Sequence, residues 1–187
     1  MSTTEIRFAG IGGQGLILCA RMLLKALGAE GRSAAQSQNY EPTSRGGLCH
    51  SDIVLGDVDA TGVDYPLLTQ LDYLVVLDEL GLAGSLPLLK PGALVISDER
   101  LVPSTPKGDF THHALGLTDK AIALGSHRVA NIIGLGLLVG LSGICPRAGL
   151  EGAISEMAPK KFLALNLEAM EAGFTLADEI QALPGAA

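Results

Sequence analysis

Apolar residues divide the chain into short segments whose spacing predicts strands and helices. Near-continuous apolar runs at 72–78 and 93–98 are typical of strands buried on both faces of a sheet. The full set of predicted strands is 5–9, 33–40, 48–55, 72–78, 93–98 and 110–115. Helical spacing of apolar residues predicts helices at 16–27, 80–89, 131–141, 146–157 and 160–182. This order predicts one α/β domain over residues 1–187, with a mostly parallel or mixed sheet and a helical C-terminal third.

The helix predicted at 80–89 connects two buried strands and so completes a βαβ unit. Such a unit implies a right-handed crossover between parallel strands. Pro91-Gly92 is expected to end this helix, because proline cannot continue a helix and glycine is common just past its end.

Composition and charge exclude some classes of function. Of the 187 residues, 48% are hydrophobic and 18% are charged, which indicates a large core and a surface that a partner protein buries. The net charge of −7 argues against nucleic-acid binding, which requires a basic surface. The apolar run 129–145 is shorter than the roughly 20 residues of a spanning helix, and the polar start MSTTEIRF is unlike a signal peptide. A cytoplasmic location is therefore expected.

The three cysteines do not form a disulfide or metal-binding motif. Cys19, Cys49 and Cys145 are far apart, odd in number and without a CxxC spacing. This usage suits a reducing compartment. No metal or iron–sulfur site is expected from this chain alone.

The sequence GIGGQG at 10–15 matches the GxGxxG pattern between a strand and a helix. Glycines there let backbone N–H groups approach an anion, and the helix N-terminus adds partial positive charge. The full dinucleotide fingerprint also requires an acidic residue at the end of the second strand. That end offers Ser37, Gln38 and Asn39, while Glu30 lies before the strand. Three interpretations stay open: an NAD(P) site, a turn near a phosphate or a partner's cofactor, and a tight turn that only glycine can form.

A polar segment, SQNYEPTSRGG at 37–47, interrupts the apolar pattern. Arg45 could bind a phosphate, a carboxylate or an acidic partner surface, or form a local ion pair. Tyr40 could stack on a ligand, anchor an interface or cap the sheet edge. The candidate cofactor-binding residues of the two segments are Gly10, Gly12, Gly13, Gln14, Gly15, Asn39, Tyr40, Arg45, Gly46 and Gly47.

No residue of the chain is predicted to be catalytic. His112 and His113 are adjacent on a predicted strand, so they point to opposite faces and cannot readily hold one metal ion. Asp78, at the end of a buried strand, is expected to cap the following helix.

The helix predicted at 131–141 contains three glycines, Gly134, Gly136 and Gly140. Glycine inside a helix costs about 1 kcal/mol relative to alanine, so these positions indicate that another segment packs against the helix backbone. The first helix or a partner subunit is the expected neighbour.

Four segments in order carry a resemblance to a known family: GIGGQG, NYEPTSRGG, NIIGLGLLVG and NLEAMEAGF. Together they resemble the gamma subunit of the 2-oxoacid:ferredoxin (or acceptor) oxidoreductases, which act on pyruvate, 2-oxoglutarate, branched-chain 2-oxoacids and indolepyruvate. The resemblance runs from Ile6 to about Ala177. The family's aromatic-x-Pro-x-x-Arg-Gly-Gly loop is matched at 40–47, with Glu41 where many relatives have glycine.

The resemblance implies a single Rossmann-like, three-layer domain and an enzyme built from several chains. Thiamine diphosphate and [4Fe-4S] clusters would lie on alpha, beta and ferredoxin-like delta partner subunits. The complex would decarboxylate a 2-oxoacid oxidatively, with coenzyme A taking the acyl group and ferredoxin the electrons. We expect 2-oxoglutarate as the substrate, because short separate gamma chains of this kind are common in that branch. The alternatives are a stand-alone NAD(P)-binding oxidoreductase and a purely structural scaffold subunit.

Overall fold

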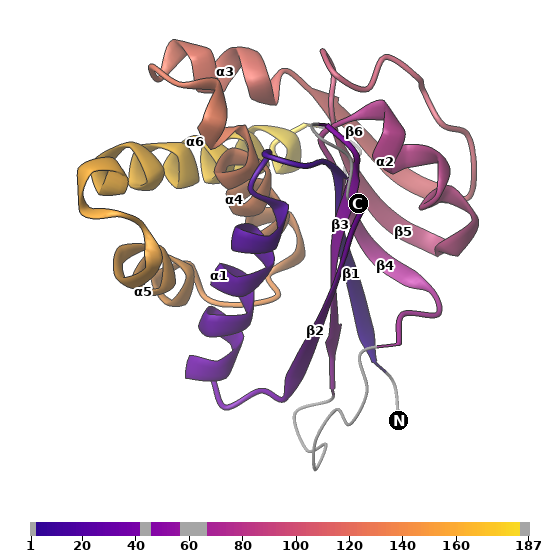
Figure 1. Ribbon diagram of the computed structural model, residues 1–187, viewed down its shortest axis with the longest axis horizontal. Coiled ribbons are helices and arrows are strands. Elements are labelled where there is room, and N and C mark those ends of the chain that lie inside the picture. The colour runs from indigo at the N-terminus through magenta and orange to yellow at the C-terminus, as the bar shows by residue number, and fades with distance from the viewer. Residues whose placement is uncertain (1–2, 42–45, 57–66, 184–187) are drawn as a thin grey trace.

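The computed structural model describes residues 3–41, 46–56 and 67–183 (Figure 1). These residues form one six-stranded sheet and a set of helices around it. The strands are β1 (Thr4–Ile11), β2 (Ala34–Tyr40), β3 (Leu48–Leu55), β4 (Leu71–Val76), β5 (Leu89–Asp98) and β6 (Phe110–Leu115). The α-helices are α1 (Leu16–Ala29), α2 (Glu79–Ala83), α3 (Leu117–Ala123), α4 (Ala130–Ser142), α5 (Arg147–Met157) and α6 (Leu163–Gln181). Short 3₁₀ turns lie at Leu86–Leu88, His127–Val129 and Lys160–Phe162.

The strand order is β2-β3-β1-β4-β5-β6. Strands β1, β4, β5 and β6 are parallel to one another, whereas β3 is antiparallel to both of its neighbours, β1 and β2. The expectation of a mostly parallel or mixed sheet is therefore confirmed. The consequence for function is that β3 separates β2 from β1, so the carboxyl ends of these two strands are not adjacent.

Helices cover both faces of the sheet. Figure 1 shows α1, α4, α5 and α6 on one side and α2 on the other. The larger core lies on the α1 side, where Ile6 and Phe8 of β1 are fully buried against helices. The smaller core lies on the α2 side and contains Ala9, Leu74 and Leu82. The alternation of these β1 residues between the two cores follows from the period of two along a strand.

The glycines of α4 lie against α6 and the sheet. A methyl group at Gly136 would lie 2.5 Å from the carbonyl oxygen of Met170, and one at Gly140 would meet Ala177. On the facing helix, Gly173 lies against the backbone of α4. The prediction of a close neighbour is confirmed, but the expected neighbour was wrong, because the last helix occupies the position that we assigned to the first helix or a partner.

The helix predicted at 80–89 was wrong in extent. Helix α2 ends at Ala83, and β5 already begins at Leu89. Pro91-Gly92 therefore lies inside β5, where the pairing with β4 shifts register between Leu71 and Tyr73. Proline has no N–H to give to a ladder, and such an irregularity is one of the few places in a sheet that accept it. Helix α3 was not predicted, because its seven residues are too few to show a helical period.

Candidate functional site

The glycine turn joins the carboxyl end of β1 to the N-terminus of α1. Gly15 is the N-cap of α1 with a φ of 75°, and Gly13 has a φ of 98°. Residues with a side chain rarely adopt these angles, so glycine is required at both positions by the backbone. The strand–turn–helix context predicted for GIGGQG is confirmed by these boundaries.

Gln14 connects the turn to the neighbouring strand β4. Its Nε2 donates to the carbonyl oxygen of Leu77 at 2.8 Å, and its Oε1 accepts from the N–H of Ile11 at 2.9 Å. A methyl group at Gly10 would overlap this Oε1 atom. The Gln14 side chain therefore holds the ends of two parallel strands together, and its role in ligand binding stays a prediction.

Tyr40, at the end of β2, reaches across β3 to the glycine turn. A methyl group at Gly12 would lie 2.7 Å from Cε2 of Tyr40, so the ring rests directly on the glycine. The N–H of Gly12 donates to the carbonyl oxygen of Gly47 at 2.9 Å. The two segments singled out in the sequence thus lie side by side at one edge of the sheet. Tyr40 is 51% exposed there.

The remaining candidate residues flank this contact. Asn39 is exposed near the end of β2, and Gly46 has a φ of 72° just before β3. Arg45 lies outside the described residues, so its contacts are not assigned. Whether these residues hold a cofactor stays a prediction.

The strand order argues against an NAD(P) site at the glycine turn. In a dinucleotide fold, the strand after the first helix lies beside β1 and supplies the acid that holds the ribose. Here β3 occupies that place, which moves β2 about 10 Å from β1 at the usual strand spacing. The end of β2 carries Asn39 and Tyr40, and the Tyr40 ring occupies the space beside Gly12.

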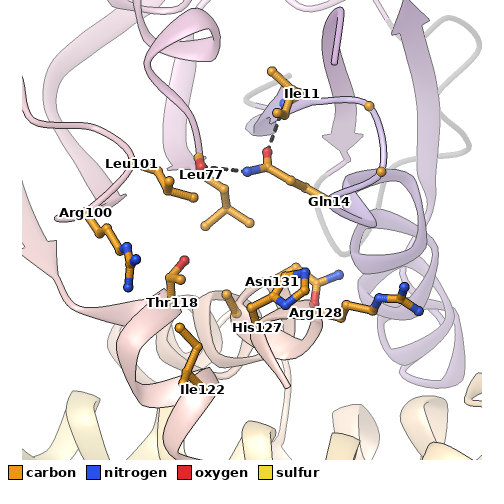
Figure 2. Close-up of a pocket in the computed structure, with 13 residues that line it drawn as sticks. Ile11, Gln14, Leu77, Arg100, Leu101, Thr118, Ile122, His127, Arg128 and Asn131 are labelled. Atoms are coloured by element: carbon orange, nitrogen blue, oxygen red, sulfur yellow. Dashed lines mark hydrogen bonds between the residues drawn. The ribbon is translucent and has the colours of Figure 1, made fainter. Parts of the chain in front are cut away.

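Two hollows lie on either side of the glycine turn. The smaller, which we call the tyrosine hollow, has a volume of about 370 Å³ and is lined by Tyr40, Arg21 and the first turn of α1. The larger, which we call the arginine cavity, has a volume of about 660 Å³. It is lined by Ile11, Gly12, Gly13, Gln14, Leu77, Arg100, Leu101, Thr118, Ile122, His127, Arg128, Ala130 and Asn131 (Figure 2).

The arginine cavity lies at the carboxyl ends of β1, β4 and β5, where ligands bind in open α/β sheets. Figure 2 shows Arg100 and Arg128 at opposite ends, with His127 and Asn131 between them. Sequence reasoning did not select these residues. Asn131 begins one of the family segments, but Arg100 lies in the loop after β5, and His127 and Arg128 lie together in the 3₁₀ turn before α4, with no motif of their own.

Two carboxylates that lie next to cavity-lining residues along the chain, Asp78 and Asp98, have structural roles. The Asp78 side chain accepts from the N–H of Leu80 at 3.1 Å, which confirms the predicted helix cap. Asp98 is fully buried and accepts from the backbone N–H of Thr118 at 2.7 Å and of Arg100 at 2.9 Å. Both groups therefore shape the loops of the cavity.

Histidines and cysteines of the described chain show no catalytic arrangement. His112 Nε2 lies 2.8 Å from Ser97 Oγ, and burial, together with His113, lowers the pKa of His112. Burial raises the pKa of the Cys145 thiol to about 11, and it also raises the pKa of Cys19 and Cys49. These thiols are therefore protonated at neutral pH. Within the ranges described, no three His, Cys, Asp or Glu side chains are placed to share a metal ion.

A buried ion pair lies on the α2 side of the sheet, away from the cavity. Arg7 donates to both carboxylate oxygens of Asp52 at 2.8 Å, and each side chain is less than 10% exposed. His50 Nε2 lies 3.8 Å from the same carboxylate. Burial and the charge of Arg7 lower the pKa of His50, although Asp52 opposes the shift. This group links β1 to β3.

No helix in the described part of the chain has the length and apolar character needed to cross a bilayer. That result agrees with the prediction made from the apolar run 129–145.

Comparison with known proteins identifies the family. The family described as Pyruvate ferredoxin/flavodoxin oxidoreductase matches residues 5–176. The 2-oxoglutarate synthase subunit KorC of Methanocaldococcus jannaschii is 34% identical over 180 residues, which cover 94% of this chain and 95% of the relative. Subunits of ketoisovalerate and pyruvate enzymes from Methanothermobacter also match, at 27–28% identity.

Solved structures agree with this relationship. The gamma subunit of a keto/oxoacid ferredoxin oxidoreductase from Geobacter sulfurreducens has a TM-score of 0.83 at 34% identity, covering 96% of this chain and 98% of that one. A 2-oxoglutarate:ferredoxin oxidoreductase from Magnetococcus marinus, solved with 2-oxoglutarate, coenzyme A and succinyl-CoA, shares the fold with a TM-score of 0.82 at 21% identity. The superposition covers 96% of this chain and 32% of that longer chain. The chain therefore belongs to the pyruvate ferredoxin/flavodoxin oxidoreductase family and is the gamma subunit of a 2-oxoacid:ferredoxin oxidoreductase.

Proposed function

We propose that the complex containing this gamma subunit acts on 2-oxoglutarate. The observation that supports this choice is the order of the relatives. Four 2-oxoglutarate synthase subunits are 32–34% identical to the chain, more than the subunits of pyruvate and ketoisovalerate enzymes. The reaction is the oxidative decarboxylation of the 2-oxoacid, with transfer of the acyl group to coenzyme A and of electrons to ferredoxin.

In this proposal the gamma chain supports the reaction and does not carry its redox groups. Thiamine diphosphate and the [4Fe-4S] clusters belong to alpha, beta and ferredoxin-like delta subunits. The donor set of this chain supports that division, because Cys19, Cys49 and Cys145 are buried in separate places and their thiols are protonated at neutral pH. A cytoplasmic location follows as part of the same proposal.

We further propose that the edge formed by the glycine turn and the 39–47 segment faces coenzyme A or the active site of a partner subunit. The candidate residues are Gly10, Gly12, Gly13, Gln14, Gly15, Asn39, Tyr40, Arg45, Gly46 and Gly47. The contact between Tyr40 and Gly12 supports this idea, since it brings the two segments into one exposed surface. An exposed aromatic ring is a common anchor for a ligand or an interface.

The composition of the purified complex tests the division of roles. Affinity purification of this chain from its native source should retain partner chains that together contain thiamine diphosphate, iron and acid-labile sulfide. The chain separated from these partners should contain none of the three. Recovery of the chain alone under gentle conditions would contradict the proposal.

Steady-state kinetics of the complex test the proposed edge. Arg45→Ala should raise the KM for coenzyme A with little change in the KM for the 2-oxoacid. Arg147→Ala is a matched control, because Arg147 pairs with Glu171 on the surface of α5 and α6. If Arg45→Ala leaves the coenzyme A dependence unchanged, the edge is a structural scaffold.

A further inference from the structure

Strand β2 forms one edge of the sheet, beside β3 (Figure 1). Two hydrogen bonds mark the ends of the ladder between these two strands. The N–H of Gly56 donates to the carbonyl oxygen of Ser33 at 2.9 Å, and the N–H of Glu41 donates to that of Leu48 at 3.0 Å. Because hydrogen-bonded pairs recur at every second residue of an antiparallel ladder, the odd-numbered residues of β2 bond to β3.

The even-numbered residues of β2 direct their backbone N–H and C=O groups away from the sheet. These residues are Ala34, Gln36, Gln38 and Tyr40. No hydrogen bond joins these backbone groups to any other residue that the structure describes. A row of unpaired backbone groups is a template on which another extended strand can pair.

The features that usually prevent pairing at a sheet edge are missing from β2. Such features are charged side chains, proline, bulges and very short strands. The sequence AAQSQNY contains no charged residue and no proline, and its register with β3 has no shift. With seven residues, β2 is also longer than the typical strand of about five or six. These observations indicate that another strand covers this edge.

The residues that flank β2 favour a second copy of this chain as the partner. Arg32 precedes the strand and Glu41 follows it, and neither forms an ion pair with another described residue. When two copies of β2 pair antiparallel, the start of each strand meets the end of the other. Each Arg32 then lies near the Glu41 of the other copy, whereas a parallel arrangement would bring like charges together. Charge complementarity therefore selects the antiparallel arrangement.

One register of this antiparallel pair engages every outward-facing residue of β2. With Ser37 on the two-fold axis, Gln36 of each copy forms a hydrogen-bonded pair with Gln38 of the other. Ala34 of each copy pairs in the same way with Tyr40 of the other. Opposing side chains lie on the same face, so the glutamine amides can bond to each other, and the small Ala34 leaves room for the tyrosine ring. A shift of the axis to Gln36 or Gln38 would leave one of the four residues without a partner in the strand.

We infer that β2 is a homodimer interface, at which two copies of this chain join their six-stranded sheets into one continuous sheet. The strands pair antiparallel about Ser37, and backbone hydrogen bonds hold them together. The complex that contains this chain accordingly has two gamma subunits in contact. The inference depends neither on the 2-oxoacid that the complex uses nor on what the glycine turn contacts.

Cysteine cross-linking tests the register. In the paired strands Ser37 lies opposite Ser37 of the second copy in a non-hydrogen-bonded pair, where the α-carbons are about 4.5 Å apart and a disulfide can form. Ser37→Cys should therefore give a covalent dimer when the full chain is treated with oxidised glutathione. Asn39→Cys is the matched control, because the two copies of that position would be about 13 Å apart. The native cysteines are buried, so the wild-type chain should stay uncross-linked.

Sedimentation of the full chain tests the backbone pairing. At about 0.1 mM, above the micromolar dissociation constant expected of a small interface, the wild-type chain should sediment at twice the 19.3 kDa mass of one chain. Gln38→Pro removes an outward N–H but no bond to β3, so the chain should fold and dimerise at least about tenfold more weakly. Gln38→Thr keeps the N–H and should leave the dimerisation constant within about threefold.

Three results would overturn the inference. The first is a wild-type chain that sediments as a monomer at 0.1 mM. The second is cross-linking of Asn39→Cys as fast as that of Ser37→Cys. The third is a purified complex in which Ser37→Cys gives no link between two gamma chains, because another subunit would then cover the edge. If Gln38→Pro fails to fold by circular dichroism, the two cysteine variants still decide the result.

Discussion

The ring of Tyr40 lies on the α-carbon of Gly12, and a methyl group added there would be 2.7 Å from Cε2 of the ring. This contact joins the end of β2 to the turn after β1 although β3 lies between the two strands. It also explains why glycine is needed at position 12. The φ of Gly12 is not positive, so the backbone conformation alone does not require glycine there. The requirement comes from a neighbouring side chain and can therefore be relieved by changing that side chain.

The first prediction concerns this contact. Gly12→Ala should lower the free energy of unfolding of the isolated chain by about 1–3 kcal/mol, the usual cost of overpacking. In the background of Tyr40→Ala, the same substitution should cost much less, because the ring that it meets is gone. Urea denaturation of the four proteins gives the coupling free energy directly. Equal costs in the two backgrounds would show that Gly12 is required for another reason.

The second prediction compares two glycines in helices. A methyl group at Gly173 of α6 would lie 2.7 Å from the backbone nitrogen of Leu137, so Gly173→Ala should destabilise the chain by about 3 kcal/mol. Gly152 of α5 has no atom within 4 Å of the same position, so Gly152→Ala should stabilise it by about 0.5–1 kcal/mol. Thermal unfolding should show opposite shifts. Shifts of the same sign would contradict the close packing of α4 on α6.

The third prediction concerns the buried pair of Arg7 and Asp52. Because each side chain is less than 10% exposed, Asp52→Leu alone would leave a buried unpaired charge and should cost about 3–5 kcal/mol of stability. The double change Arg7→Met with Asp52→Leu should cost much less than the sum of the single changes. Additive losses, measured by urea denaturation, would show that the two charges are not coupled.

The sign of the pH dependence follows from His50. Burial and Arg7 lower its pKa in the folded chain below the value of about 6.5 in the unfolded chain. The unfolded chain therefore binds the proton more readily, so stability is full above pH 6.5 and falls as the pH drops toward the folded pKa. His50→Gln should reduce the loss of stability between about pH 7.5 and 5.5. An unchanged pH profile would mean that His50 does not contribute to it.

Much of the fold could be predicted because its signals are local. The buried strands β4 and β5 are apolar runs, and α1 and α6 have helical periods long enough to recognise. The strand order could not be predicted, because the apolar pattern of residues 48–55 does not indicate that this strand, β3, pairs antiparallel with β1. The neighbour of α4 was also missed. Glycines on one side of a helix indicate that another segment packs closely there, but they do not identify that segment.

Part of the candidate site could likewise be predicted from the sequence, and part of it could not. GIGGQG and the 37–47 segment were recognisable as motifs, and the structure brings Gly12, Tyr40 and Gly47 together. The arginine cavity was missed, because Arg100, in the loop after β5, and Arg128, in the 3₁₀ turn before α4, are separated along the chain and line one cavity only in the folded structure. A search for cations that follow buried strands would have found Arg100, but no sequence signal relates it to Arg128.

The proposed substrate is tested most directly by the activity of the purified complex on a panel of 2-oxoacids. Initial rates with 2-oxoglutarate, pyruvate, 2-oxoisovalerate and indolepyruvate would be measured with coenzyme A and a dye acceptor. We predict that kcat/KM for 2-oxoglutarate exceeds that for each of the others by at least about tenfold, or roughly 1.4 kcal/mol of transition-state stabilisation. An equal or higher kcat/KM for pyruvate or 2-oxoisovalerate would contradict the account.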